Sequence, residues 1–217
     1  MKVEGCYFPD DLLYDTDGNI WVREEGGKAR LGITSIVSWL SGGFTSVSFK
    51  QPGSRVESGR VLGSVEGFRR FDVVRAPFDC VIVSVNERLL SEPRLLNRDS
   101  YGTGWFAVVQ PLSDLHASLL AGERATGALS AAVKRLGVRC FAAFPDHEMY
   151  EIGVECSAVL VKLDDLLSGS RPGTVVHIVS DDNSAEVEME RWVGRTGNEL
   201  LETRREGALH HFLVRKR

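Results

Sequence analysis

Two patterns of apolar and polar residues divide the chain. Up to about residue 112, apolar residues come in short runs, several of them alternating with polar residues, and Gly or Pro turns separate the runs. Such runs are typical of β-strands in a barrel or a sandwich. They predict strands at 20–23, 29–33, 45–50, 60–65, 72–75, 80–85 and 105–110.

From residue 113 the spacing of apolar residues becomes helical. One or two amphipathic helices fit the apolar positions Leu115, Leu119, Leu129, Val133 and Leu136. A stretch rich in turn residues follows, with Pro145 before Asp146. We therefore predict a first domain of residues 1–137, a linker of 138–148 and a second domain of 149–217.

The second domain has a mixed pattern of its own. It predicts a strand at 149–155, a helix at 157–167, a strand at 174–180, a second helix after residue 183 and a hairpin of 199–204 with 209–215. Asp181, Asp182 and Asn183 are N-cap candidates for the second helix. The order β-α-β-α-β-β predicts a small α+β two-layer sandwich with both helices on one side of the sheet.

Composition narrows the classes of function. The net charge is −4 and the pI is about 5.8, which argues against a protein that wraps nucleic acid. No apolar run is long enough to span a bilayer, and the first residues lack the apolar core of a signal peptide. We expect a cytoplasmic protein whose partners are other proteins, without binding to nucleic acid or membrane.

The four cysteines, Cys6, Cys80, Cys140 and Cys156, form no C-x-x-C pair, and no histidine stands at zinc spacing beside them. We expect no metal, and in a reducing compartment four free thiols. Cys6 and Cys80 are expected to be structural. Cys140 is expected to be a core or linker residue, with a role as resolving partner for Cys156 as the alternative.

Residues 8 to about 120 carry a long and specific pattern. It includes FPDDLLYDTDGNIWV, LGITSIV and APFDCVIVSVNERLLSEPRLLNRDSYGTGWF, with Asn86-Glu87, Pro93, Leu96-Asn97 and the run from Tyr101 to Trp105. This stretch resembles the glycine cleavage system H protein and its lipoate-binding relatives. The resemblance implies a mainly β barrel-sandwich hybrid of the lipoyl-domain type, with a cofactor lysine at the tip of an exposed hairpin.

The corresponding hairpin reads GSVEGFRRFDVVRAP, residues 63–77. The family has V-E-S-V-K-A before its A-P, and an ungapped count puts Arg69 at the place of the lysine. A guanidinium stays charged and cannot form the lipoyl amide, so we expect neither lipoate nor another cofactor. Two interpretations of Phe68, Arg69 and Arg70 remain open: a solvated turn, or a cationic tip that docks an acidic or phosphorylated partner.

The second domain, from about residue 149 to 216, resembles the TusA-type sulfur carriers. The text YEIGVECSAVLVKLDDLLSGSRPGTVVHIVSDD follows the family's strand, cysteine, helix, Pro-Gly turn and Asp-Asp strand end. The resemblance implies that Cys156 accepts sulfur as a persulfide, and a helix N-terminus favours the thiolate that this needs. Two features depart from the pattern: both prolines of Cys-Pro-x-Pro are missing, and Glu155 adds a negative charge.

Two hypotheses for the function follow. The first is a sulfur relay, with a persulfide on Cys156 and a non-lipoylated docking domain. The second is a non-catalytic adaptor or regulatory protein in lipoate or sulfur metabolism, in which both domains have lost their chemistry. The sequence has no nucleophile triad and no Gly-rich phosphate loop, so we expect at most a sulfurtransferase-type carrier.

Overall fold

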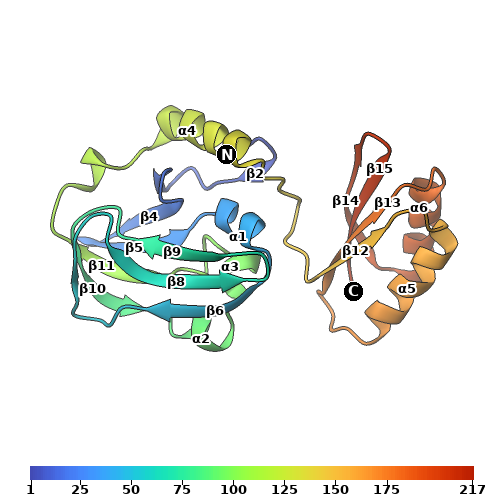
Figure 1. Cartoon of the computed structure of the whole chain (residues 1–217), viewed down its shortest axis with the longest axis horizontal. Helices are drawn as coiled ribbons and strands as arrows, with labels where there is room; N and C mark the ends of the chain where they lie inside the picture. The colour runs from blue at the N-terminus through green and yellow to red at the C-terminus, as the bar shows by residue number, and fades with distance from the viewer. The chain divides into compact units, whose positions relative to one another are not determined.

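A computed structural model describes residues 1–217 and divides them into two compact units, Met1–Cys140 and Phe141–Arg217 (Figure 1). The division lies inside the predicted linker of residues 138–148. None of the helices combines the length and the apolar character that a transmembrane span requires.

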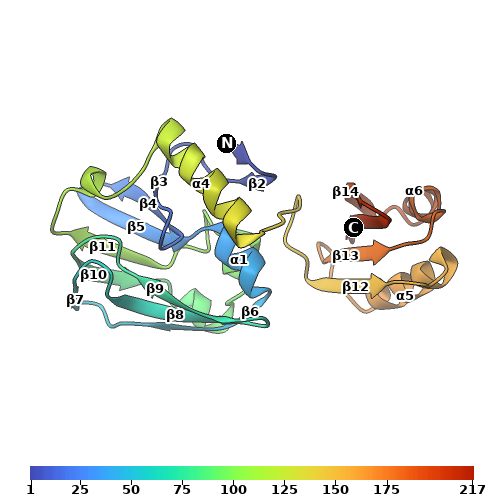
Figure 2. The ribbon, with the colours of Figure 1, turned by 45° about the horizontal axis from the view of Figure 1, so that its top comes forward.

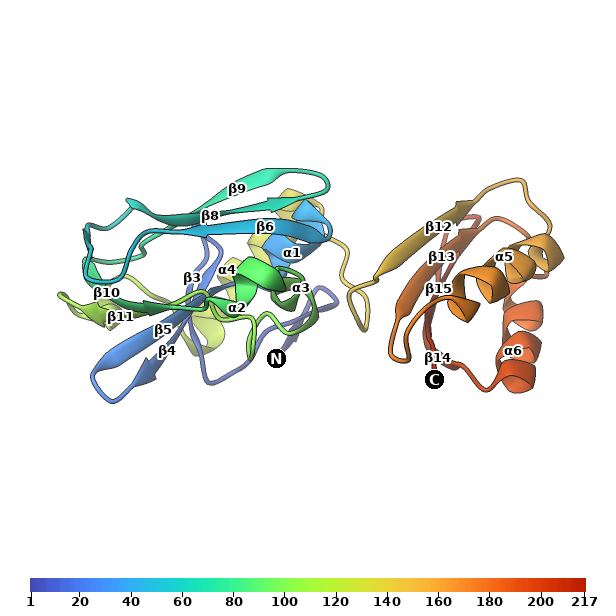
Figure 3. The same cartoon turned by 90° about the horizontal axis from the view of Figure 1, so that it is seen from below.

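The first unit is a sandwich of two β-sheets. The larger sheet has the order β3 (Leu13–Asp15), β4 (Ile20–Glu25), β5 (Lys28–Ile33), β11 (Ala107–Pro111), β10 (Cys80–Val85) and β7 (Arg55–Val56). The smaller sheet has the order β6 (Phe44–Phe49), β8 (Val61–Gly67) and β9 (Phe71–Arg75). Figure 3 shows the smaller sheet lying over the larger one.

The space between these sheets is the main core of the first unit. Leu31 and Val109 from the larger sheet pack in one buried cluster with Val47, Val65 and Val74 from the smaller sheet. The three valines of the smaller sheet alternate along their strands with polar or exposed residues, as strand residues on one buried face do.

A second core lies beneath the long helix of the first unit. Helix α4 (Gly122–Leu136) buries Leu129 and Val133 against Trp21 and Ile36. The cluster also includes residues of the hairpin of β1 (Lys2–Val3) and β2 (Cys6–Tyr7), seen beside α4 in Figure 2. The remaining helices are short: α1 (Ser35–Ser41), α2 (Arg88–Ser91), α3 (Leu95–Arg98) and a 3-10 turn (Leu115–Ala117).

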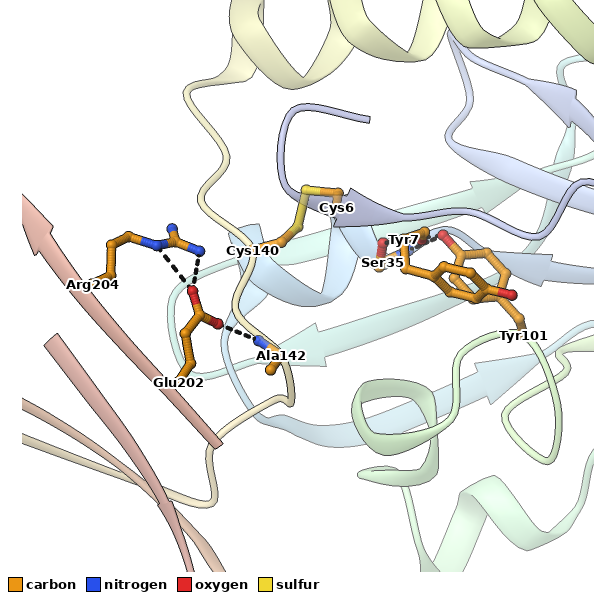
Figure 4. The surroundings of a disulfide bond; sticks show 8 residues. All are labelled: Cys6, Tyr7, Ser35, Tyr101, Cys140, Ala142, Glu202 and Arg204. Carbon is orange, nitrogen blue, oxygen red and sulfur yellow. Dashed lines mark hydrogen bonds and ion pairs between the residues drawn. A yellow bond between two sulfur atoms is a disulfide. The ribbon is translucent and has the colours of Figure 1, made fainter. Parts of the chain in front are cut away.

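A disulfide joins Cys6 to Cys140 (Figure 4). The expectation of four free thiols is wrong for this pair, and so is the alternative of Cys140 as a partner of Cys156. The fold brings β2 and the chain after α4 together, with 5.0 Å between the Cα atoms of the two cysteines. The two residues are 134 positions apart, so the sequence pattern does not show that they meet. Cys80 and Cys156 are free and buried.

The second unit has the order β12 (His147–Glu151), α5 (Cys156–Ser168), β13 (Val175–Ser180), α6 (Ala185–Thr196), β14 (Glu199–Glu206) and β15 (Leu209–Arg215). Its sheet has the order β12-β13-β15-β14, with only β12 and β13 parallel. Both helices lie on one side of this sheet (Figure 1). Leu163, Ile178, Trp192 and Phe212 are buried between the two layers.

The residues before β12 are held by the second unit. The Ala142 N–H donates to Glu202 Oε2 at 2.7 Å (Figure 4), and the Asp146 N–H donates to the Val175 carbonyl at 2.7 Å. The Phe141 ring lies 4.3 Å from the Arg204 guanidinium, measured to the ring centroid. Much of the predicted linker is therefore part of the second unit's structure.

We expect reduction of the Cys6–Cys140 disulfide to destabilise the first unit. The bond closes a loop of 134 residues, and loop-closure entropy alone gives a stabilisation of about 5 kcal/mol. Thermal unfolding followed by circular dichroism should show a lower Tm when reductant is added. The double variant Cys6→Ser with Cys140→Ser should melt at this lower temperature with or without reductant. An unchanged Tm of the reduced wild type would contradict a stabilising role.

Candidate functional site

The turn between β8 and β9 holds Phe68, Arg69 and Arg70, the three residues that the sequence placed at the hairpin tip. The Gly67 N–H donates to the Arg70 carbonyl at 2.9 Å and closes the turn. All three side chains are exposed, and Phe68 reaches 70% exposure. The tip therefore presents one aromatic ring and two guanidinium groups.

The backbone of this turn is fixed to the end of α1. The Arg69 N–H donates to the Ser41 carbonyl at 2.9 Å, and the Phe68 N–H donates to the Gly43 carbonyl at 3.2 Å. A Cβ atom at Gly67 would lie 2.4 Å from the same Ser41 oxygen, so only glycine fits while the turn keeps this contact.

The loop between α1 and β6, to which the turn is hydrogen-bonded, is held in place by the buried side-chain amide of Asn97. Asn97 Oδ1 accepts the Phe44 N–H at 2.9 Å, and Asn97 Nδ2 donates to the Gly42 carbonyl at 3.0 Å. Asn97 is only 7% exposed, so both hydrogen bonds are shielded from water.

The tip arginines have specific neighbours. Arg70 forms an ion pair with Asp72, whose Oδ2 accepts the Ser41 hydroxyl at 2.8 Å. Arg69 Nη1 lies 3.5 Å from the Trp39 carbonyl. The Arg94 guanidinium lies 5.4 Å from the centroid of the Phe68 ring, within cation-π range.

Cys156, the second site that the sequence proposed, is the first residue of α5. Cys156 is only 2% exposed, and its backbone N–H donates to Asp182 Oδ2 at 2.7 Å. Burial, and then the negative charges of Asp182 and Glu188, raise the pKa of the Cys156 thiol to about 11. The helix N-terminus favours a thiolate here, whereas burial and these carboxylates oppose it and outweigh it in the pKa.

Asp182 connects the N-termini of both helices in the second unit. Its Oδ2 accepts the Cys156 N–H, and its Oδ1 accepts the N–H and the hydroxyl of Ser184 at 2.8 and 2.9 Å. These hydrogen bonds, that from the Ser184 N–H first, lower the pKa of the Asp182 carboxyl. The sequence suggested Asp182 among the N-cap candidates of the second helix, but the N-cap is Ser184, which donates to Asp182. The bond from Asp182 to the first helix could not be predicted from sequence.

The histidines of the closing hairpin face opposite sides of the sheet, as the alternation of strand residues predicted. His210 Nδ1 lies 3.0 Å from Glu186 Oε1 on α6, whereas His211 Nδ1 lies 3.0 Å from His177 Nε2. Sequence reasoning missed the His177–His211 pair because it depends on the register of β13 and β15. No group of three or more His, Cys, Asp or Glu side chains in residues 1–217 is arranged to hold a metal ion.

Comparison with known proteins identifies the first unit. The sequence model of the glycine cleavage H-protein family matches residues 12–131. Glycine cleavage system H protein 5 of Aquifex aeolicus (strain VF5) is 34% identical over 145 residues, which cover 64% of this chain and 98% of that protein. H protein 2 of the same organism is 34% identical over 146 residues, which cover 64% of this chain and 90% of that protein. The chain belongs to the glycine cleavage H-protein family.

A solved structure agrees with this assignment. The crystal structure of a glycine cleavage system H protein from Mycobacterium marinum matches with a TM-score of 0.50 and 28% identity, over 60% of this chain and all of that one. The match confirms the predicted β-sandwich of the lipoyl-domain type. The family match ends at residue 131, so the likeness of residues 149–216 to TusA-type carriers remains a prediction from their sequence.

The tip of this H-protein domain does not fit a lipoyl group. The lysines of the first unit are Lys2, Lys28, Lys50 and Lys134, and none lies in the turn between β8 and β9. The turn offers guanidinium groups instead, and these do not lose the proton that an attacking amine must lose.

We expect Asp182→Asn to lower the pKa of Cys156 from about 11. The substitution removes a negative charge that disfavours the thiolate, while burial, the larger cause, keeps the pKa above the ordinary value. The pH dependence of iodoacetamide alkylation, read by mass mapping, measures the shift, with the buried thiol of Cys80 as internal reference.

The matched control is Asp181→Asn. Asp181 accepts the Gly153 N–H at 2.8 Å and is not among the causes of the Cys156 shift, so Cys156 should titrate as in the wild type. Equal titration in both variants would show that Asp182 does not control the thiol.

Proposed function

We propose that this protein is a non-lipoylated member of the H-protein family that acts as a docking adaptor in lipoate or sulfur metabolism. The observation that carries this proposal is Arg69 in the turn between β8 and β9, at the position where an ungapped count from Glu66 to Pro77 puts the family's lipoyl lysine. Without an amine there, the domain keeps the family's fold and loses its covalent cargo.

The tip supports a docking role. Phe68 is 70% exposed and Phe71 is 60% exposed, and Arg69 and Arg70 lie between them in sequence. Exposed aromatic and arginine side chains are enriched at the centres of protein interfaces. Guanidinium groups bind carboxylates and phosphates through paired hydrogen bonds, so an acidic or phosphorylated partner fits this tip. The names of the relatives assign those proteins to the glycine cleavage system. For this chain we propose docking on a partner enzyme but no lipoyl group.

A sulfur relay through Cys156 is the second candidate. The position of Cys156 at the N-terminus of α5 favours it. The burial of the residue and a thiol pKa of about 11 weigh against it, because the attacking species is the thiolate. We therefore place the adaptor first.

The wild-type protein should stay unmodified when it is incubated with a lipoate–protein ligase, lipoate and ATP. Arg69→Lys places an amine at the family position and should gain a lipoyl group, whereas the neighbouring Arg70→Lys should not. Intact mass and peptide mapping measure the result. A lipoyl mass anywhere in residues 60–76 of the wild type would overturn the adaptor proposal.

Incubation with a cysteine desulfurase and cysteine separates the two candidates. The adaptor predicts no sulfur on Cys156 after mass mapping under non-reducing conditions. Sulfur on Cys156 that disappears in Cys156→Ala would replace the adaptor with the sulfur relay.

A further inference from the structure

The outer face of the smaller sheet contains an open groove of about 430 Å³ between β6, β8 and β9. Its floor is made of small residues: the Ser48 and Ser64 hydroxyls lie 2.7 Å apart, beside Gly63. A Cβ atom at Gly63 would lie 2.1 Å from the Ser48 carbonyl and 2.8 Å from the core ring of Phe106, so only glycine fits at this position of β8. The groove is therefore a shallow depression, in whose middle short side chains, Ser48 and Ser64, lie between the larger residues of β6, β8 and β9.

Apolar side chains stand along this groove and are exposed to water. Val61, Phe71 and Val73 line it, with exposed fractions of 43%, 60% and 38%. Alternate strand residues share a face, so Phe71, Val73 and Arg75 of β9 form one row, with neighbours about 7 Å apart. An extended peptide has the same two-residue period.

The charged groups around the groove are mainly cationic. On the groove face the cations are Lys50, directly after β6, and Arg75 on β9, and the carboxylate is Glu66 on β8. Lys50 lines the groove, and neither Lys50 nor Arg75 forms an ion pair with a carboxylate of this chain. Glu66, on the same face, accepts the Ser46 hydroxyl at 3.0 Å. The face therefore complements an acidic ligand.

We propose that this groove binds an extended segment of a partner protein that has two apolar side chains two residues apart and a carboxylate two residues further on. The apolar pair lies against Phe71 and Val73, and the carboxylate meets Arg75 or Lys50. The inference rests on the proposed docking function and gives it a second, sequence-selective surface beyond the hairpin tip.

The test uses the full chain labelled with ¹⁵N and the capped peptide Asp-Ser-Val-Ser-Ile-Ser-Asp, which matches the groove in either direction. Saturable shifts of the amide signals of Val61, Phe71 and Val73 are expected. The same peptide with Lys in place of Asp should bind about fivefold more weakly, since one exposed ion pair is worth up to about that factor.

Matched variants locate the site. Val73→Thr keeps the branched shape and replaces a methyl group with a hydroxyl, so the peptide Kd should rise several-fold. Val83→Thr is the control, because Val83 has the same 38% exposure but lies on β10 of the other sheet. The double variant Lys50→Gln with Arg75→Gln should bind the Asp and the Lys peptides equally.

Three results would overturn the groove. The first is the absence of saturable shifts on β6, β8 and β9, and the second is equal weakening by Val73→Thr and Val83→Thr. The third is self-association that shifts the same amide signals without peptide, which would identify a second copy as the occupant. Shifts confined to Phe68–Arg70 would reject the groove but not the proposed docking function. Lipoylation of the wild-type tip would reject that function but would not affect the test of peptide binding to the groove.

Discussion

The hydrogen bonds of the buried Asn97 amide are the constraint on which the hairpin tip depends. This side chain satisfies backbone groups on both sides of the bend between α1 and β6, and the bend in turn accepts the N–H groups of Phe68 and Arg69. Loss of the amide would leave buried backbone groups without partners, at a cost of about 1–3 kcal/mol each. The geometry of the tip therefore depends on Asn97, a residue about 30 positions further along the chain.

Both positions to which the sequence assigned chemistry share one property. By the ungapped count, Arg69 falls where the family has an amine that can lose a proton, and a guanidinium keeps its proton. Cys156 stands where a thiolate was expected, and its burial and the neighbouring carboxylates favour the protonated thiol. Neither position therefore favours the deprotonated form that its chemistry needs, although the elements that would present it are intact. Interfaces that these elements form with other proteins would not depend on that chemistry.

The parts of the structure that sequence could predict are those with a short-range cause. Short apolar runs between turns located β4, β5, β6, β8, β9, β10 and β11, and the ungapped distance from Glu66 to Pro77 located Arg69 in the turn. Helix α1 was missed because its seven residues are too few to show a helical period. The Cys6–Cys140 bond, the Asp182–Cys156 bond and the His177–His211 pair were missed for another reason. Each joins residues 26 or more positions apart, and their meeting depends on topology and strand register.

The position of Cys140 also has a consequence for synthesis of the protein. Cys140 lies beyond residue 131, where the match to the H-protein family ends, and Cys6 lies before residue 12, where it begins. The ribosome therefore completes the whole H-protein domain before the second sulfur atom is available. Until then the first unit has only non-covalent contacts, and oxidation adds a covalent link between two segments that flank the family match on either side.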